Sequence, residues 1–210
     1  MDLLFLIILG GLWGSFANVC IVRMPKDKGV VSGRSNCPKC KKQISWKDNI
    51  PIISYFLLGG KCRKCKKPIS FRYVVVELLS IISFVLIYYL FALSWTTLLL
   101  IILSLGFIII FFIDLEHFII PNLVTFPLIA IGFLKSFIPD LDPIFPNYVM
   151  SLIGGIFGYG IIWAIIFFYK QVKNKEGMGL GDAKLLAVIG FWFGLDACLL
   201  YTSPSPRDCQ

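Results

Sequence analysis

Long apolar runs constrain the fold of this chain more than any other feature. A helix needs about 20 residues to cross the ~30 Å hydrocarbon core of a bilayer. Six stretches of roughly this length occur: residues 3–22, 73–93, 95–113, 121–138, 148–169 and 183–200. The composition agrees, since 58% of the residues are apolar and 15% are charged. The sequence therefore predicts an all-α polytopic membrane helix bundle with about six spans.

Basic residues are concentrated in one block, which predicts the orientation. Between Arg23 and Arg72 there are fourteen Lys and Arg residues against two acids, and basic loops stay on the cytoplasmic side of a membrane. We therefore expect this block to be cytoplasmic and the N-terminus to lie outside. Alternation of the spans then places Lys173 inside and Asp142 outside. Lys135 departs from this pattern, and we expect its side chain to extend to the outer interface.

Two C-x-x-C pairs lie within the basic block. Cys37 and Cys40 form "CPKC", and Cys62 and Cys65 form "CRKC". Paired knuckles of this kind present four thiolates to one tetrahedral Zn²⁺. Such a centre is closed to a catalytic water, so we predict a structural zinc in a small cytoplasmic zinc-ribbon-like segment. Disulfides are the alternative, although a reducing compartment disfavours them.

The lysine-rich zinc segment also raises the question of nucleic acid. The positive-inside rule and anionic lipid headgroups already account for its charge. The lipid bilayer is therefore the expected partner of this charge, and no nucleic acid is expected.

Two carboxylates stand at breaks between predicted spans, on the same side of the membrane. Asp114 follows the third span, and Asp182 follows the glycine-rich "GMGLG". Helix capping is an alternative explanation for Asp182, because Asp is a favoured N-cap residue. Capping does not explain Asp114, because a carboxylate in the last turn of a helix meets the negative end of the dipole. Two acids that share a proton can activate water for amide hydrolysis.

These motifs together resemble one family. The stretches "GSFANVCIVRMP", "CPKCKKQISWKDNIPIISYFLLGGKCRKCKKPISFRYVVVELL", "IDLEHFIIPNLVTFP" and "GMGLGDAKLLA" are similar, in order and spacing, to the type IV prepilin peptidases, which are G-x-G-D aspartic proteases. The resemblance implies that Asp114 and Asp182 are the catalytic pair. The residues that match the motif around Asp182 are Gly177, Gly179, Gly181 and Lys184. Asn122 stands where the family commonly has an acid.

The resemblance also implies a function. Family members cut the basic leader of pilin-like precursors after a glycine at the cytoplasmic face of the bacterial inner membrane. They then methylate the new N-terminus with S-adenosylmethionine, in systems for pili, type II secretion and DNA uptake. Another G-x-G-D intramembrane protease and a non-catalytic, zinc-dependent membrane scaffold of an export system are the alternatives. Which residues would hold the methyl donor is not indicated by the sequence.

The predicted organisation has four parts. They are a first transmembrane helix (1–22), a cytoplasmic zinc-binding segment (23–72), a transmembrane peptidase core (73–200) and a tail (201–210). The tail, "YTSPSPRDCQ", is rich in Ser, Pro and charge, and is interpreted as a truncation or an artefact because it is foreign to the rest of the fold.

Overall fold

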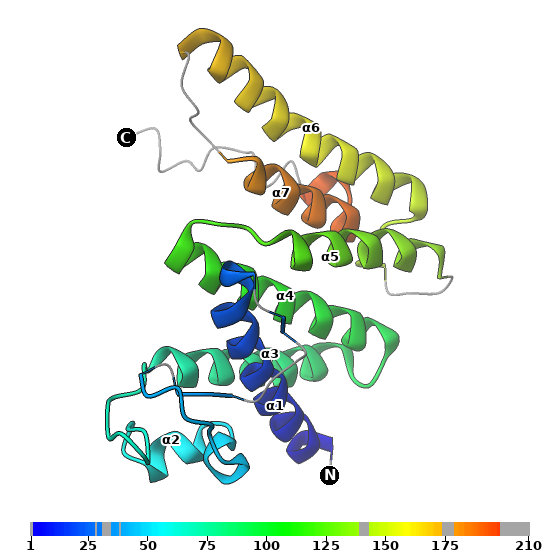
Figure 1. Ribbon diagram of the computed structural model, residues 1–210. Coiled ribbons are helices and arrows are strands. Elements are labelled where there is room, and N and C mark those ends of the chain that lie inside the picture. Colours follow the sequence, from blue (N-terminus) through cyan, green and yellow to red (C-terminus); the bar gives the residue numbers. More distant parts are fainter. Residues whose placement is uncertain are drawn as a thin grey trace, which may run out of the picture. The chain divides into compact units, whose positions relative to one another are not determined.

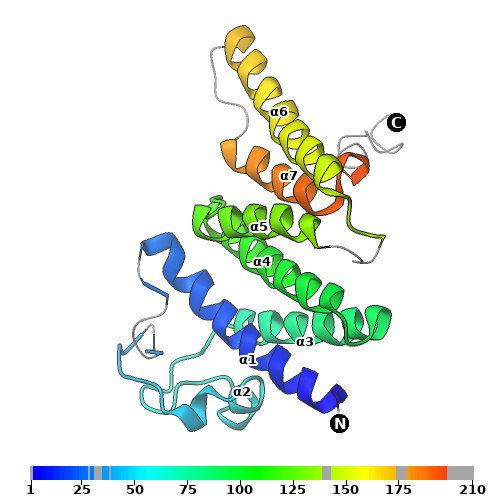
Figure 2. The same cartoon turned by 90° about the vertical axis from the view of Figure 1, so that its right-hand side faces the viewer.

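The apolar runs fold into helices in the computed structural model (Figures 1 and 2). It describes residues 2–27, 29–30, 35–37, 39–138, 143–173 and 179–197. The α-helices are α1 (Asp2–Arg23), α2 (Ile53–Leu57), α3 (Arg72–Phe91), α4 (Trp95–His117), α5 (Asn122–Leu134), α6 (Tyr148–Lys173) and α7 (Leu180–Phe193). Short 3₁₀ turns are η1 (Met24–Lys26), η2 (Trp46–Asn49) and η3 (Lys135–Phe137). The predicted all-α class is confirmed for these residues.

Within the described residues, four helices are long and apolar enough to cross a membrane: α1, α3, α4 and α6. The fourth expected span corresponds to α5 and η3, and the sixth to α7, and both of these are shorter. The expected count of about six spans is therefore not confirmed. The expected sixth span, 183–200, also begins too late, because α7 starts at Leu180 and ends at Phe193, before Gly194 with φ of 81°. The tail lies outside the described residues.

The chain divides into two units, Met1–Phe118 and Ile119–Gln210. In the first unit, α1 and α3 pack antiparallel through small residues. A Cβ on Gly10 would lie 2.9 Å from the Cα of Ile81, and one on Gly14 would lie 2.8 Å from the Cα of Glu77. Close backbone approach at small residues is a common way for helices to pack in membranes. Asn18 adds a hydrogen bond from its side-chain amide to the carbonyl of Tyr73, at 3.0 Å.

Helix α4 joins this pair through an apolar cluster. Phe84 of α3 packs with Ile101 and Leu105 of α4, and all three are buried. The helix starts at an N-cap, Ser94, whose hydroxyl accepts from the backbone N–H of Thr97 at 3.2 Å. It ends at Phe118, which has φ of 55° and whose N–H bonds the carbonyl of Asp114 at 2.8 Å. Asp114 therefore belongs to the last turn of α4.

In the second unit, α7 packs against α5 and α6. Here two glycines bring backbones together, since a Cβ on Gly190 of α7 would lie 2.1 Å from the carbonyl oxygen of Gly154 on α6. The hydroxyl of Ser151 donates to the carbonyl of Phe191 at 2.7 Å. On the other side, the indole N–H of Trp192 donates to the carbonyl of Leu128 in α5 at 2.8 Å. These contacts fix the position of α7 within its unit.

The expectation for Lys135 is wrong. Its side chain does not extend outward; the residue is 2% exposed. The ammonium nitrogen lies 4.2 Å from the ring centroid of Phe145 and 5.8 Å from that of Trp192. The aromatic faces attract the cation, which explains why burial is tolerated here.

Candidate metal centre and catalytic carboxylates

The four cysteines predicted to bind zinc come together in the first unit. The Sγ atoms of Cys37, Cys40, Cys62 and Cys65 all lie within 4.8 Å of one another. The pair Cys37 and Cys65 is 3.8 Å apart, far longer than the roughly 2.05 Å of a disulfide bond. All four are free thiols, so the disulfide alternative is not supported.

The two knuckles have the same backbone design. In the first, the N–H of Cys37 bonds the carbonyl of Lys42, and the N–H of Lys41 bonds the carbonyl of Cys37. In the second, the N–H of Cys62 bonds the carbonyl of Lys67, and the N–H of Lys66 bonds the carbonyl of Cys62, so every partner lies 25 residues further along. Lys41 and Lys66 both have positive φ, at 57° and 54°. The two loops are therefore copies of one turn.

A repeat in the sequence underlies this symmetry, and our sequence analysis missed it. Residues 36–44 read "NCPKCKKQI" and residues 61–69 read "KCRKCKKPI", with six identical positions of nine. Short bridges close both loops, pairing Asn36 with Gln43 and Lys61 with Pro68. The spacing of the cysteines alone had suggested the metal site, whereas the repeat also predicts the equivalent backbone hydrogen bonds.

The electrostatics of the cluster favour a metal. Backbone N–H groups of Cys40 and Lys39 lower the pKa of the Cys37 thiol to about 6, and a backbone hydrogen bond from Cys65 lowers that of Cys62. The backbone of Lys67 lowers the pKa of Cys65, but burial and the neighbouring thiols outweigh it and raise this pKa to about 11. Four thiolates therefore do not coexist readily without a cation between them.

The geometry fits zinc. A tetrahedral Zn²⁺ with Zn–S bonds of about 2.3 Å separates its sulfurs by about 3.8 Å. That value matches the distance between Cys37 and Cys65. Four sulfur ligands would fill the coordination sphere, so a metal bound here would have a structural role.

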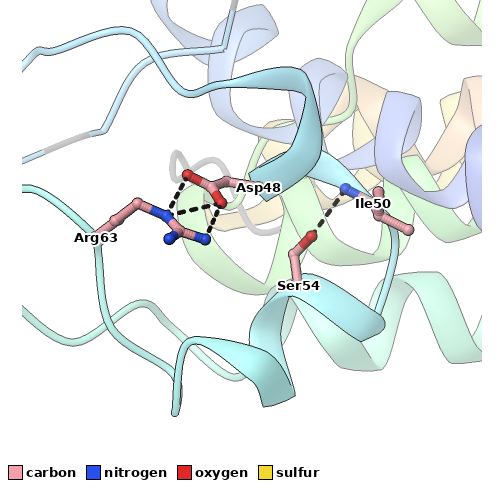
Figure 3. A network of polar contacts seen from close by, with 4 residues as sticks. All are labelled: Asp48, Ile50, Ser54 and Arg63. Carbon is pink, nitrogen blue, oxygen red and sulfur yellow. Dashed lines mark hydrogen bonds and ion pairs between the residues drawn. The ribbon is translucent and has the colours of Figure 1, made fainter.

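An ion pair holds the second knuckle to the loop before α2 (Figure 3). Arg63, which lies between Cys62 and Cys65, donates to both carboxylate oxygens of Asp48, with distances of 2.7 to 3.0 Å. Beyond it, the hydroxyl of Ser54 accepts from the N–H of Ile50 at 3.0 Å. The hydrogen bond and charge of Asp48 raise the pKa of Arg63, which remains charged.

Asp114 is exposed near the end of α4, in the first unit. Two residues later, Glu116 forms an ion pair with Arg72, the first residue of α3. The last turn of α4 is therefore tied to the first turn of α3, which directly follows the second knuckle. No local pattern in the sequence predicts this contact, because the two residues lie 44 positions apart.

Asp182 lies in the first turn of α7, in the second unit. The N-cap of this helix is Gly179, so the alternative that Asp182 is the N-cap is wrong. Gly181 lets α7 approach the segment just before α5, since a Cβ here would lie 3.0 Å from the side chain of Ile120. Gly177 lies outside the described residues. Asp114 and Asp182 fall in different units.

Lys184 supports the start of α7 through a contact that was not predicted. Its ammonium donates to the side-chain carbonyl of Asn122 at 2.6 Å and lies 5.6 Å from the ring centroid of Phe126. The first turns of α5 and α7 are thus joined directly. An acid at position 122 would form an ion pair in the same place, so the departure to Asn122 preserves the hydrogen bond and removes the charge.

The fold and these side chains define a multi-pass membrane protein with a cluster of four cysteine thiols suited to a metal ion. Comparisons with known proteins show which family of membrane proteins this is. Residues 8–91 match the bacterial Peptidase A24 N-terminal domain, and residues 101–203 match the type IV leader peptidase family. The chain belongs to this leader peptidase family.

Curated relatives span most of the chain. A protein of Neisseria gonorrhoeae is 36% identical, covering 90% of this chain and 73% of its own length. One from Pseudomonas aeruginosa is 33% identical, covering 90% and 71%, and one from Klebsiella pneumoniae is 36% identical, covering 96% and 90%. Each is named prepilin leader peptidase/N-methyltransferase. No solved structure matches the chain.

Proposed function

We propose that this protein is a membrane aspartic endopeptidase that removes the basic leader of pilin-like precursors after a glycine. The observation that carries the proposal is the similarity to leader peptidases over 90% of the chain, together with the family match over residues 101–203, a range that contains both aspartates. Other G-x-G-D proteases and a non-catalytic scaffold are the competing functions.

The proposed chemistry uses Asp114 and Asp182 on one water molecule. The positive end of the α7 dipole stabilises a carboxylate in its first turn, so Asp182 takes the proton from the water. Asp114 holds the shared proton and donates it to the oxygen of the scissile carbonyl, as in aspartic dyads. The mechanism requires both carboxyl groups to reach the same water molecule.

The proposed site faces the cytoplasm of a bacterial inner membrane. Two observations support this orientation. The cysteine segment leaves α1 at Arg23 and returns at Arg72, and the antiparallel packing of these helices brings both ends to one side. The ion pair between Arg72 and Glu116 puts the last turn of α4 at the same end. Basic residues favour the cytoplasmic side for that end.

The decisive experiment compares Asp114→Asn and Asp182→Asn with the parent enzyme in reconstituted membranes, using a precursor whose basic leader ends in glycine. Loss of general acid–base catalysis is expected to slow cleavage by about 10²- to 10⁴-fold in each variant. Asp196→Asn, which changes an exposed carboxylate of the same unit, is the matched control and should cleave normally. Normal cleavage by either dyad variant contradicts the mechanism, and no cleavage by the parent favours the scaffold alternative.

We further propose that the protein methylates the new N-terminus with S-adenosylmethionine, as the names of its relatives indicate for those proteins. Zinc bound by the four cysteines supports the segment structurally and takes no part in hydrolysis. Mass spectrometry of the processed substrate checks the methylation, since its N-terminus should gain one methyl group only when the donor is present.

A further inference from the structure

An uncharged stretch interrupts the basic segment between the knuckles. Residues 49–60 read "NIPIISYFLLGG", and charged residues flank the stretch at Asp48 and Lys61. An apolar run of about 10 to 14 residues is too short to span a bilayer as a helix but is typical of re-entrant or interfacial segments. This stretch contains α2, which lies level with the amino-terminal half of α1 in both views (Figures 1 and 2).

Pro51 lies beside the middle of two spanning helices. A Cβ on Gly11 would be 3.3 Å from the Cβ of Pro51 and 3.6 Å from the Cδ1 of Ile81. Gly11 is halfway along α1 and Ile81 halfway along α3. At a rise of 1.5 Å per residue, these positions lie about 14 to 18 Å from the charged ends at Arg23 and Arg72. Half of the hydrocarbon core measures about 15 Å, so Pro51 reaches the depth of the bilayer centre.

Two backbone N–H groups next to Pro51 have hydrogen-bond partners within the protein. Ile52 has φ of 60° and ψ of −53°, which makes a γ-turn of the rare, strained type, closed by the bond from the N–H of Ile53 to the carbonyl of Pro51. The N–H of Ile52 itself donates to the buried carboxylate of Glu77 at 2.7 Å. Non-helical backbone is tolerated inside a membrane where such protein groups satisfy it.

The side chains of α2 that point away from the bundle are apolar. Ile53 is 56% exposed, Phe56 66% and Leu57 80%. The Tyr55 hydroxyl extends in the other direction and bonds the carbonyl of Ile69, just before α3, at 3.5 Å. In water these three side chains would form an exposed apolar patch, which is unfavourable in free energy. At the depth of Pro51 they meet hydrocarbon instead.

We propose that residues 50–57 form a re-entrant segment that enters the bilayer beside α1 and α3, with Ile53, Phe56 and Leu57 against lipid acyl chains. The cysteine knuckles then lie at the membrane surface, as the two legs of this hairpin. The proposal depends on α1 and α3 crossing the membrane and does not depend on the peptidase activity.

The test measures the depth of position 57 in the full chain, reconstituted in vesicles of phosphatidylcholine with phosphatidylglycerol. A nitroxide is attached through p-acetylphenylalanine at Leu57, which leaves the zinc cysteines untouched. Oxygen concentrates in the bilayer and a water-soluble nickel chelate does not, so their effects on the label report its surroundings. Ile82 of α3, 57% exposed at mid-helix, is the lipid reference. Lys64, in the second knuckle, is the water reference.

A label at position 57 should relax at least fivefold more strongly with oxygen than with the nickel chelate, as at position 82 and opposite to position 64. Strong relaxation by the chelate would overturn the proposal, because the segment would lie in water. Weak relaxation by both would also overturn it, because a protein surface, from a second copy or another partner, would cover the patch. If the variant at position 57 fails to fold, the same label at Phe56 gives the same readout.

Discussion

The two units hold their aspartates by different means. In the first unit, polar side chains tie Asp114 indirectly to the zinc segment, since Glu116 pairs with Arg72 at the start of α3. In the second, the helix that bears Asp182 is held mainly by backbone packing, with Gly190 of α7 against Gly154 of α6, and one hydrogen bond from Lys184 to Asn122 supports its start. The difference teaches that metal loading and charge should affect the first unit, whereas side-chain volume should affect the second.

Zinc removal should give the largest effect and should be confined to the first unit. Structural zinc sites contribute about 10 to 16 kcal/mol of apparent binding free energy, so Cys62→Ser or a chelator should unfold the knuckles. Hydrogen exchange measured by mass spectrometry should then rise in residues 35–71 and stay unchanged in α6 and α7. Cys20→Ala, which changes a cysteine buried in α1, should retain the metal. Exchange that rises equally in both units would remove the distinction between them.

Gly190→Ala should give the next largest effect, this time in the second unit. The added Cβ would lie 2.1 Å from a backbone oxygen, and overpacking of this kind costs about 1 to 3 kcal/mol. Unfolding in mixed detergent micelles, followed by circular dichroism, measures the loss. The matched change Gly160→Ala on α6 meets open space and should leave stability equal or slightly higher. Equal stability of the two variants would contradict close packing of α6 on α7.

Breaking the ion pair between Arg72 and Glu116 should have a moderate effect on the peptidase. A partly exposed pair contributes up to about 1 kcal/mol, so Arg72→Gln should lower kcat roughly fivefold by loosening the helix end that bears Asp114. The double exchange Arg72→Glu with Glu116→Arg should recover part of the rate, which a general loss of folding would not allow. Arg63→Gln, which breaks the pair with Asp48 instead, is the control and should leave kcat close to that of the parent.

Asn122→Asp should have the smallest effect. The new carboxylate would face the ammonium of Lys184, now 2.6 Å from the amide oxygen, and exposed ion pairs contribute about 0.2 to 1 kcal/mol. A double-mutant cycle with Lys184→Met measures the coupling, which should weaken as salt is added. A coupling that does not change with salt would show that the amide hydrogen bond already supplies the whole interaction.

Short-range patterns in the sequence predicted the long helices and the cysteine cluster. The apolar runs gave the ends of α1, α3 and α4 to within a few residues, and the cysteine spacing gave the metal cluster, because each knuckle is a turn of adjacent residues. The end of α7 was missed because Gly194, with φ of 81°, stops the helix inside an apolar run that continues beyond it. The pairs of Arg72 with Glu116 and Lys184 with Asn122 were missed because folding alone brings such distant positions together.

The buried Lys135 has a consequence for biosynthesis. Lys135 directly follows α5, at the start of η3, and a buried lysine there opposes insertion of this apolar segment into the membrane. Trp192, one of the two aromatic rings that surround its ammonium, is synthesised 57 residues later. At about 5 to 20 residues per second, the helix around Lys135 waits several seconds for this aromatic partner. We therefore expect the α5 segment to insert stably only once α7 has been synthesised, so that these two helices enter the membrane in one cooperative step.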